Sequence, residues 1–136
     1  MKMPTTPETG HFCWVDLATH DADRAAAFYG DLFGWKPRDE RVGPGHVTRL
    51  LSNGTAVGSL YQLNREQIHR GVPSHWTPYV AVASLDATSK RAASLGGRII
   101  VKSFEVPGVA RVGLVMDPIG ALIGLWQQTN GRDNSG

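Results

Sequence analysis

The feature that most limits how this chain can fold is an internal repeat. The segment GTAVGSLYQ at 54–62 returns as GALIGLWQQ at 120–128, and LFGW at 32–35 returns as LGGR at 95–98. WVDLATHDA at 14–22 aligns with the second half in two registers, which differ by two residues and keep the same strand face. A repeat of this length indicates two copies of one supersecondary unit.

The first copy begins with a strand and a helix. Residues 12–18 form an apolar run that is rich in β-favouring residues and whose only acid is Asp16. The next segment, 21–33, has apolar residues at helical spacing, and Gly34 can end the helix in the left-handed conformation. The residues expected on its buried face are Ala25, Phe28, Tyr29, Leu32 and Phe33.

The remainder of the first copy is predicted to be β-structure. A short strand over 35–41 and a turn at 42–45 are followed by two apolar runs, 46–52 and 55–63. Asn53-Gly54 joins the two runs, and this dipeptide is a strong hairpin signal. The first copy is therefore predicted to have the order β-α-β-β-β.

The second copy repeats this order after a polar linker at 64–74, with a helix over 85–95. The predicted fold class is α+β, in which two β-α-β-β-β modules at 11–63 and 75–128 form a single domain at 11–128. Residues 1–10 and 129–136 are polar and are expected to be loose termini.

Composition excludes several classes of protein. The net charge of +2 comes without a basic run, so no nucleic-acid partner is expected. No apolar run approaches the length of a membrane helix, and residues 1–10 lack the apolar core of a signal peptide. The single cysteine, Cys13, suits a reducing compartment. We therefore expect a cytoplasmic protein that does not associate with membranes.

Three segments resemble the vicinal oxygen chelate superfamily, which includes glyoxalase I, the bleomycin-resistance proteins and the extradiol dioxygenases. They are DADRAAAFYGDLFGW at 21–35, LDATSKRAASLGGRI at 85–99 and DPIGALIGLWQ at 117–127. The resemblance covers 11–128. It implies two curved mixed sheets around a shared cleft, helices on the outside, and a homodimer.

The resemblance also implies four positions for metal ligands, on the first and last strand of each module. In this chain they fall on Trp14 and Gly58 in the first module, and on Thr77 or Tyr79 and Gly124 in the second. The superfamily's enzymes usually have His, Glu or Gln there. None of the residues present is a useful ligand, so no metal cofactor is expected.

Strand alternation predicts which side chains line the cleft. The turn at Asn53-Gly54 would pair Arg49 with Gly58. The loop at 117–120 would pair Gly113 with Gly124 and Arg111 with Trp126. The expected ligand-binding residues are Trp14, Asp16, Arg49, Gly58, Tyr79, Arg111, Gly124 and Trp126. Aromatic rings beside guanidinium groups favour a flat ligand that is anionic or carries a carbonyl.

The same residues could alternatively have structural roles and not bind a ligand. The aromatic side chains of Trp14, Tyr79 and Trp126 would alternatively fill the space left by the absent ligands. Asp16 would alternatively form a structural ion pair with Arg49 or Arg111. Among the histidines only His75 keeps the cleft parity, and Cys13 has the opposite parity to Trp14, as a small apolar residue would.

Three functions are compatible with these patterns. The first is a metal-free protein of the glyoxalase and bleomycin-resistance type that binds a small organic ligand. The second is a divalent-metal-dependent lyase, isomerase or dioxygenase of the same superfamily. The third is an interaction module whose sheets support a dimer. The sequence identifies neither the ligand nor any catalytic residue, and it leaves open whether the protein is an enzyme.

Overall fold

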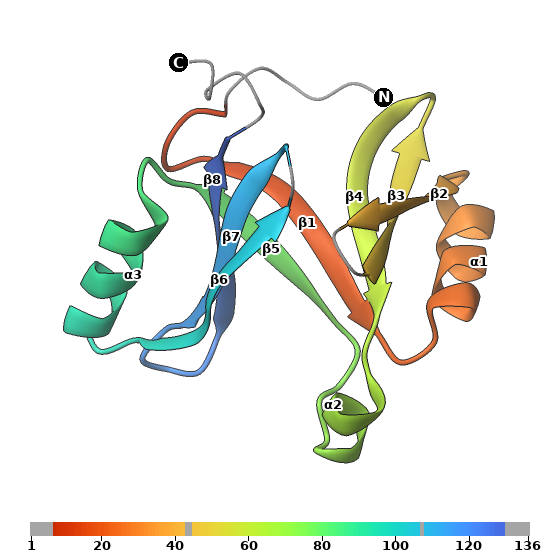
Figure 1. Cartoon of the computed structure of the whole chain (residues 1–136). Helices are drawn as coiled ribbons and strands as arrows, with labels where there is room; N and C mark the ends of the chain where they lie inside the picture. Colours follow the sequence, from red (N-terminus) through yellow and green to blue (C-terminus); the bar gives the residue numbers. More distant parts are fainter. Residues whose placement is uncertain (1–6, 43–44, 107, 130–136) are drawn as a thin grey trace. The chain divides into compact units, whose positions relative to one another are not determined.

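The computed structural model describes residues 7–42, 45–106 and 108–129 (Figure 1). Within these ranges the chain forms eight strands and three helices, as expected for the α+β class. Their bounds, in chain order, are β1 (Phe12–Thr19), α1 (Ala22–Phe33), β2 (Lys36–Val42), β3 (Gly45–Ser52), β4 (Thr55–Gln62), α2 (Arg65–His69), β5 (His75–Ala81), α3 (Leu85–Ser94), β6 (Arg98–Val106), β7 (Ala110–Met116) and β8 (Leu122–Gln128). None of the described helices has the length and hydropathy of a membrane span.

Contacts divide the chain into two compact units. The first unit comprises Trp14–Thr77, and the second comprises the chain from Pro78 onward together with the segment that ends at Cys13. The strand order is β2-β3-β4-β1 in the first unit and β5-β8-β7-β6 in the second. The pairs β1–β4 and β5–β8 are parallel, and the other pairs within each unit are antiparallel. The two units thus have equivalent strand orders, as the internal repeat in the sequence predicts.

The ends of α1 follow the local signals in the sequence. Asp21 is the N-cap, and its side chain accepts a hydrogen bond from the Arg24 backbone N–H at 3.0 Å. Gly34 ends the helix at φ 76°, where its N–H donates to the Gly30 carbonyl oxygen. The prediction of a helix over 21–33 is therefore confirmed, and α3 likewise falls within the predicted 85–95.

The core of the first unit lies between its sheet and α1. Leu17, Leu50 and Leu60 are buried there. The partly buried residues packed against them are Ala22, Ala25, Ala26, Tyr29 and Trp35. Figure 1 shows α1 lying along β2 and β3. The helix therefore meets the sheet mainly through alanines, whose small side chains allow a close approach.

The predicted buried face of α1 is accordingly wrong for its largest members. Phe28, Leu32 and Phe33 are 58%, 57% and 55% exposed, and no α1 residue is fully buried. The hydrophobic period correctly located the apolar face of the helix. It could not show that alanines on one edge of that face would make the contact with the sheet.

The second unit has an analogous core beneath α3. Leu85, Val115 and Leu125 are buried, and Val82, Ala92 and Ile123 pack against them. Ser84 caps the helix by accepting a hydrogen bond from the Ala87 backbone N–H at 3.1 Å.

Residues 64–74 are more ordered than a linker. A short helix, α2, occupies Arg65–His69. Asn64 and Gln67 form a capping box, in which each side chain accepts a hydrogen bond from the backbone N–H of the other. The predicted termini at 1–10 and 129–136 and the predicted turn at 42–45 lie partly outside the described residues.

Both predicted hairpin registers are wrong by one residue. A β-bulge after Leu50 pairs Arg49 with Ser59 and Leu50 with Gly58. In the second unit the loop runs from 117 to 121, because the Asp117 carboxylate accepts hydrogen bonds from the backbone N–H groups of Ile119 and Ala121. Arg111 therefore pairs with Gln127, Val112 with Trp126, Gly113 with Leu125 and Leu114 with Gly124.

Candidate functional site

A row of polar side chains crosses the sheet of the first unit on the face opposite α1. Arg49 pairs with Ser59 across β3 and β4, and Ser59 pairs with Asp16 across β4 and β1. Their chain neighbours Leu50, Leu60 and Leu17 point to the α1 side, where they form the core. Trp14 precedes Asp16 by two residues and shares its face. We call Trp14, Asp16, Arg49 and Ser59 the polar row.

A chain of hydrogen bonds links three members of the polar row. The indole Nε1–H of Trp14 donates to Ser59 Oγ at 2.9 Å. The Ser59 hydroxyl donates in turn to Asp16 Oδ1 at 2.8 Å. One hydroxyl therefore acts as acceptor and donor at once, which fixes the orientation of both the indole ring and the carboxyl group.

Arg49 joins the row from β3. The residue is 7% exposed, and its Nε–H donates to Glu40 Oε1 at 2.7 Å. The guanidinium carbon lies 5.8 Å from the centre of the Trp14 ring, within the range of a cation–π contact. Glu40 is thus a carboxylate partner of Arg49, while Asp16 accepts a hydrogen bond from Ser59.

Asp16 has an unusual acidity for an aspartate. Burial raises its pKa to about 6, although the Ser59 hydrogen bond and the electrostatic influence of His75 act in the opposite direction. Burial, together with the negative charge of Asp16, also raises the pKa of Tyr61. Asp16 therefore exchanges its proton near neutral pH, where a carboxyl group can either donate a hydrogen bond or accept a proton.

The predicted residues of the second unit form a separate aromatic group. Tyr79 pairs with Gly124 across β5 and β8, and a side-chain carbon added to Gly124 would overlap the Tyr79 ring. The rings of Tyr79 and Trp126 meet edge to face with their centres 6.0 Å apart. Trp126 Nε1 donates to Gln128 Oε1 at 2.9 Å. In this unit the space above the glycine is filled by an aromatic ring.

Two predicted site residues lie on the helix side of their sheets. Arg111 shares its face with Gln127 and Leu125, and its Nη2 lies 3.6 Å from Asp86 Oδ1 at the start of α3. A side-chain carbon on Gly58 would contact Val15, on the side of the sheet that carries α1. The predicted placement of Arg111 with Trp126 and of Gly58 with Trp14 is therefore wrong, because both registers had been set one residue away.

Ser59 is central to the row and Glu40 binds its arginine, and neither residue was predicted from the sequence. The signal for Ser59 was its neighbour Leu60, a large apolar residue that belongs in the core and so directs Ser59 to the opposite face. Glu40 lies on β2, whose charged sequence gives no sign of a particular partner.

The residues of the polar row do not fit a divalent metal. Trp14 offers only an indole N–H, Ser59 a neutral hydroxyl and Arg49 a positive charge. Asp16 is the one carboxylate. Among residues 7–42, 45–106 and 108–129, no three His, Cys, Asp or Glu side chains are grouped so as to hold a metal ion. The chemistry of these donors disagrees with the metal site that the resemblance implies.

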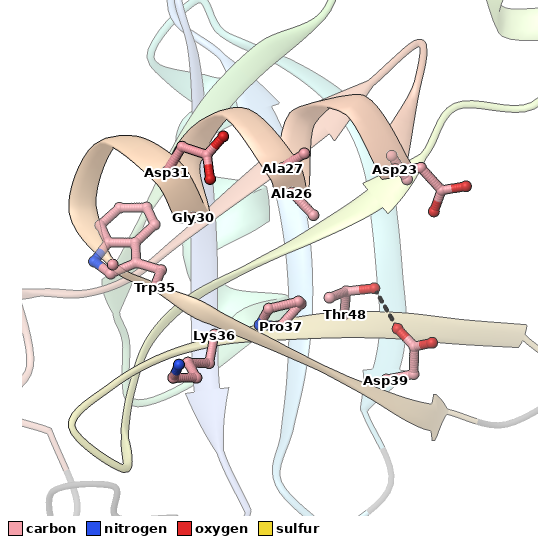
Figure 2. Close-up of a pocket in the computed structure, with 12 residues that line it drawn as sticks. Asp23, Ala26, Ala27, Gly30, Asp31, Trp35, Lys36, Pro37, Asp39 and Thr48 are labelled. Atoms are coloured by element: carbon pink, nitrogen blue, oxygen red, sulfur yellow. Dashed lines mark hydrogen bonds between the residues drawn. The ribbon is translucent and has the colours of Figure 1, made fainter.

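A groove of about 570 Å³ lies on the other face of the same sheet, between α1 and β2 (Figure 2). Small residues of the helix, among them Ala26 and Gly30, form one wall, and Trp35 and Pro37 lie opposite. Asp39 accepts a hydrogen bond from Thr48 at 2.8 Å at one end. The groove shares no residue with the polar row, so the two features are independent.

Residues 10–125 match the model of the Glyoxalase/Bleomycin resistance protein/Dioxygenase superfamily. The chain belongs to this superfamily. The polar row is the candidate site of this superfamily member.

The chain is similar to proteins of Mycobacterium and Streptomyces. It is 35% identical over 116 residues to "Putative glyoxylase CFP32" of Mycobacterium bovis, covering 84% of this chain and 44% of that protein. It is 33% identical over 129 residues to "Anthracycline biosynthesis protein DnrV" of Streptomyces peucetius, covering 85% and 46%. The chain thus spans less than half the length of these relatives.

A solved structure shares the fold. The crystal structure of methylmalonyl-CoA epimerase from Mycobacterium tuberculosis has a TM-score of 0.61 and 22% identity, and the similarity covers 93% of each chain. At this level of identity the similarity establishes the fold alone.

Proposed function

We propose that this chain binds a small organic molecule on the polar row without a metal ion. The observation that carries the proposal is the hydrogen-bonded series Trp14–Ser59–Asp16 with the guanidinium of Arg49 set against the Trp14 ring. Such a series holds an aromatic surface, a cation and a carboxyl group in fixed relative positions. A few fixed polar groups beside an aromatic wall are typical of small-molecule sites.

The chemistry of the row defines the ligand class. The Trp14 ring favours a flat, unsaturated ligand, and Arg49 favours a carboxylate or carbonyl oxygen. Glu40 accepts the Nε–H of Arg49 at 2.7 Å, and this contact fixes the direction of the guanidinium group. Asp16, with a pKa of about 6, can present a hydrogen-bond donor to the same molecule below that pH.

The name of the Streptomyces relative supports a planar ligand. That protein is called an anthracycline biosynthesis protein. An anthracycline contains a fused aromatic ring system with carbonyl oxygens, which combines the two features that Trp14 and Arg49 favour. We therefore take an anthracycline as the first probe. The shared cleft and the cytoplasmic location stay predictions that belong to this proposal.

The test is a fluorescence titration with daunorubicin, an anthracycline, repeated with Trp14→Leu and Arg49→Gln. We expect saturable binding by the unmodified protein and at least roughly tenfold weaker binding by each variant, since each loses one of the two main contacts. Arg111→Gln is the matched control, because this arginine lies on the α3 side of the second unit. Thermal unfolding of every variant separates loss of binding from loss of folding.

Two results would refute the proposal. One is identical affinity in Trp14→Leu, Arg49→Gln and Arg111→Gln. The other is saturable binding that requires an added divalent metal and disappears with a chelator. Absence of daunorubicin binding would reject an anthracycline as the ligand. A panel of aromatic carboxylates titrated against the same variants would then test whether the polar row binds any ligand of this class.

A further inference from the structure

The groove between α1 and β2 is a second concave surface of the first unit, and the function proposed above does not use it (Figure 2). Its volume of about 570 Å³ lies in the range of small-molecule sites. The wall formed by α1 consists of Ala26, Ala27 and Gly30, whose small size leaves the space beside β2 open. The groove is therefore large enough for a small ligand.

One end of the groove is closed where the chain passes from α1 to β2. A side-chain carbon on Gly30 would lie 3.1 Å from the Trp35 carbonyl oxygen, so the helix and the start of β2 approach each other closely there. The Trp35 ring packs against Phe33 and Tyr29, with ring centres 4.8 Å and 6.0 Å away. Pro37 continues the β2 side of the groove. The closed end and the adjoining walls are thus apolar and well packed.

Three carboxylates border this apolar surface. Asp23 and Asp31 lie one turn before and one turn after Ala27, on the same stripe of α1. Asp39 lies on β2, where the Thr48 hydroxyl donates to its Oδ1 at 2.8 Å and orients the carboxylate. Within the part of the chain that the structure describes, none of the three forms an ion pair. A groove bordered by carboxylates, in a chain whose net charge is +2, favours a cationic ligand.

Lys36 is the cation among the described lining residues. Strand alternation places Lys36 on the face of β2 that also carries Glu40, opposite to the face of Asp39. Figure 2 shows the Lys36 side chain directed away from α1. Lys36 therefore leaves the space between the helix and β2 to the carboxylates.

The spacing of the carboxylates sets the length of the cation. Asp23 and Asp31 are eight residues apart, which separates them by about 12 Å along the helix axis. Asp39 lies about 10 Å of strand beyond the start of β2, and Figure 2 shows it, like Asp23, at the end away from Trp35. One ammonium group is too small to meet carboxylates at both ends. Two ammonium groups joined by an extended methylene chain match this spacing.

We propose that the groove binds a linear aliphatic diamine or polyamine in its protonated form. The methylene chain lies along Ala27 and Pro37, where it is removed from water. One terminal ammonium group meets Asp31, and the other meets Asp23 and Asp39. The groove shares no residue with the polar row, so a ligand can occupy either feature independently of the other.

The test is an NMR titration of isotope-labelled protein with 1,8-diaminooctane, whose extended length is close to the separation of Asp23 and Asp31. We expect saturable shifts of the backbone amide signals of Gly30 and Thr48, with a dissociation constant on the order of 1 mM, as is typical of so small a ligand. The indole N–H signal of Trp14, in the polar row, should stay unchanged.

Two shorter or less charged amines test the match in length. 1,3-Diaminopropane reaches the carboxylates of one end only, and 1-aminooctane has a single ammonium group. Each should bind about two- to fivefold more weakly than 1,8-diaminooctane, because each loses an ion pair exposed to solvent.

Substitutions in the groove test its residues. Ala27→Leu fills the groove at an exposed helix position where leucine is well tolerated, and it should weaken binding by about tenfold or more. Ala93→Leu, at an exposed position of α3 in the second unit, is the matched control. Asp23→Asn and Asp31→Asn should each weaken binding about two- to fivefold, and Asp86→Asn should not.

Three outcomes would overturn the proposal. The first is a titration without saturable shifts of the groove signals, including one in which only signals of the polar row move. The second is equal affinity for 1,3-diaminopropane and 1,8-diaminooctane, which would show a diffuse attraction of cations to the surface. The third is unchanged binding by Ala27→Leu, Asp23→Asn and Asp31→Asn, each with the well-dispersed spectrum of a folded protein.

Discussion

Asp16 makes the stability of the first unit depend on pH. Its pKa is raised from 3.8 to about 6 in the folded chain, chiefly by burial. Between these two values the folded state binds more protons than the unfolded state, so the free energy of unfolding falls as the pH rises. The difference of roughly two pH units corresponds to about 3 kcal/mol, which is fully present below pH 4 and lost above pH 6.

We predict that Asp16→Asn raises the free energy of unfolding at pH 7 by up to about 3 kcal/mol. The amide avoids burial of a charge, and its oxygen can still accept the hydrogen bond from Ser59. Urea unfolding from pH 4 to pH 8 should show a falling stability in the unmodified protein and a flatter profile in the variant. Asp86→Asn, at an exposed carboxylate, is the control. Equal slopes for Asp16→Asn and the unmodified protein would contradict the account of Asp16.

The parallel pair β5–β8 depends on a glycine beneath an aromatic ring. Tyr79 occupies the space that a side chain on Gly124 would need, and the affected atoms belong to the rigid ring. We predict that Gly124→Ala lowers the free energy of unfolding by about 1–3 kcal/mol through overpacking. In a Tyr79→Leu background the loss should be smaller, because the ring is absent. A double-mutant cycle measured by denaturant unfolding checks this; additive losses would show that the ring and the glycine are not coupled.

The elements differ in how far the sequence could predict them. The bounds of α1 and α3 follow from local caps at Asp21, Gly34 and Ser84, so sequence patterns predict them closely. Strand register depends on an extra residue of β4, Val57, which lies opposite the step from Leu50 to Leu51, and on a loop closed by Asp117. Neither the bulge nor the length of the loop can be recognised from the hydrophobic periodicity of the sequence. Each nevertheless changes the face of every side chain that follows it.

The same difference decides which site residues could be predicted. Trp14 and Asp16 lie on one strand, so alternation alone keeps them together. Arg49 joins them through Ser59, a residue that the predicted register had turned to the opposite face. The predicted placement of Arg111 is wrong because its hairpin loop is one residue longer than expected. A prediction can therefore name the correct residues of a site and still assign them the wrong partners.

At the scale of the whole molecule, superfamily membership and residue chemistry lead to different expectations. The resemblance to the superfamily's enzymes implies a divalent metal held by His, Glu or Gln on the first and last strand of each module. The residues at those positions include Trp14, Tyr79 and Gly124, and the corrected register adds the hydroxyl of Ser59. The chain has the fold of the superfamily, but these residues lack the chemistry of metal ligands, so fold alone does not determine the chemistry of this chain.

We predict that the purified protein contains far less than one divalent metal ion per chain. Asp16 is the only carboxylate in the polar row, and one carboxylate does not hold a divalent metal tightly. The positive charge of Arg49, set against the Trp14 ring, also opposes a dication. Elemental analysis of protein purified without chelators or affinity metals is the measurement, and Asp16→Ala is the matched variant. About one zinc, iron or nickel per chain, lost in Asp16→Ala, would show that the row recruits a metal with ligands from elsewhere.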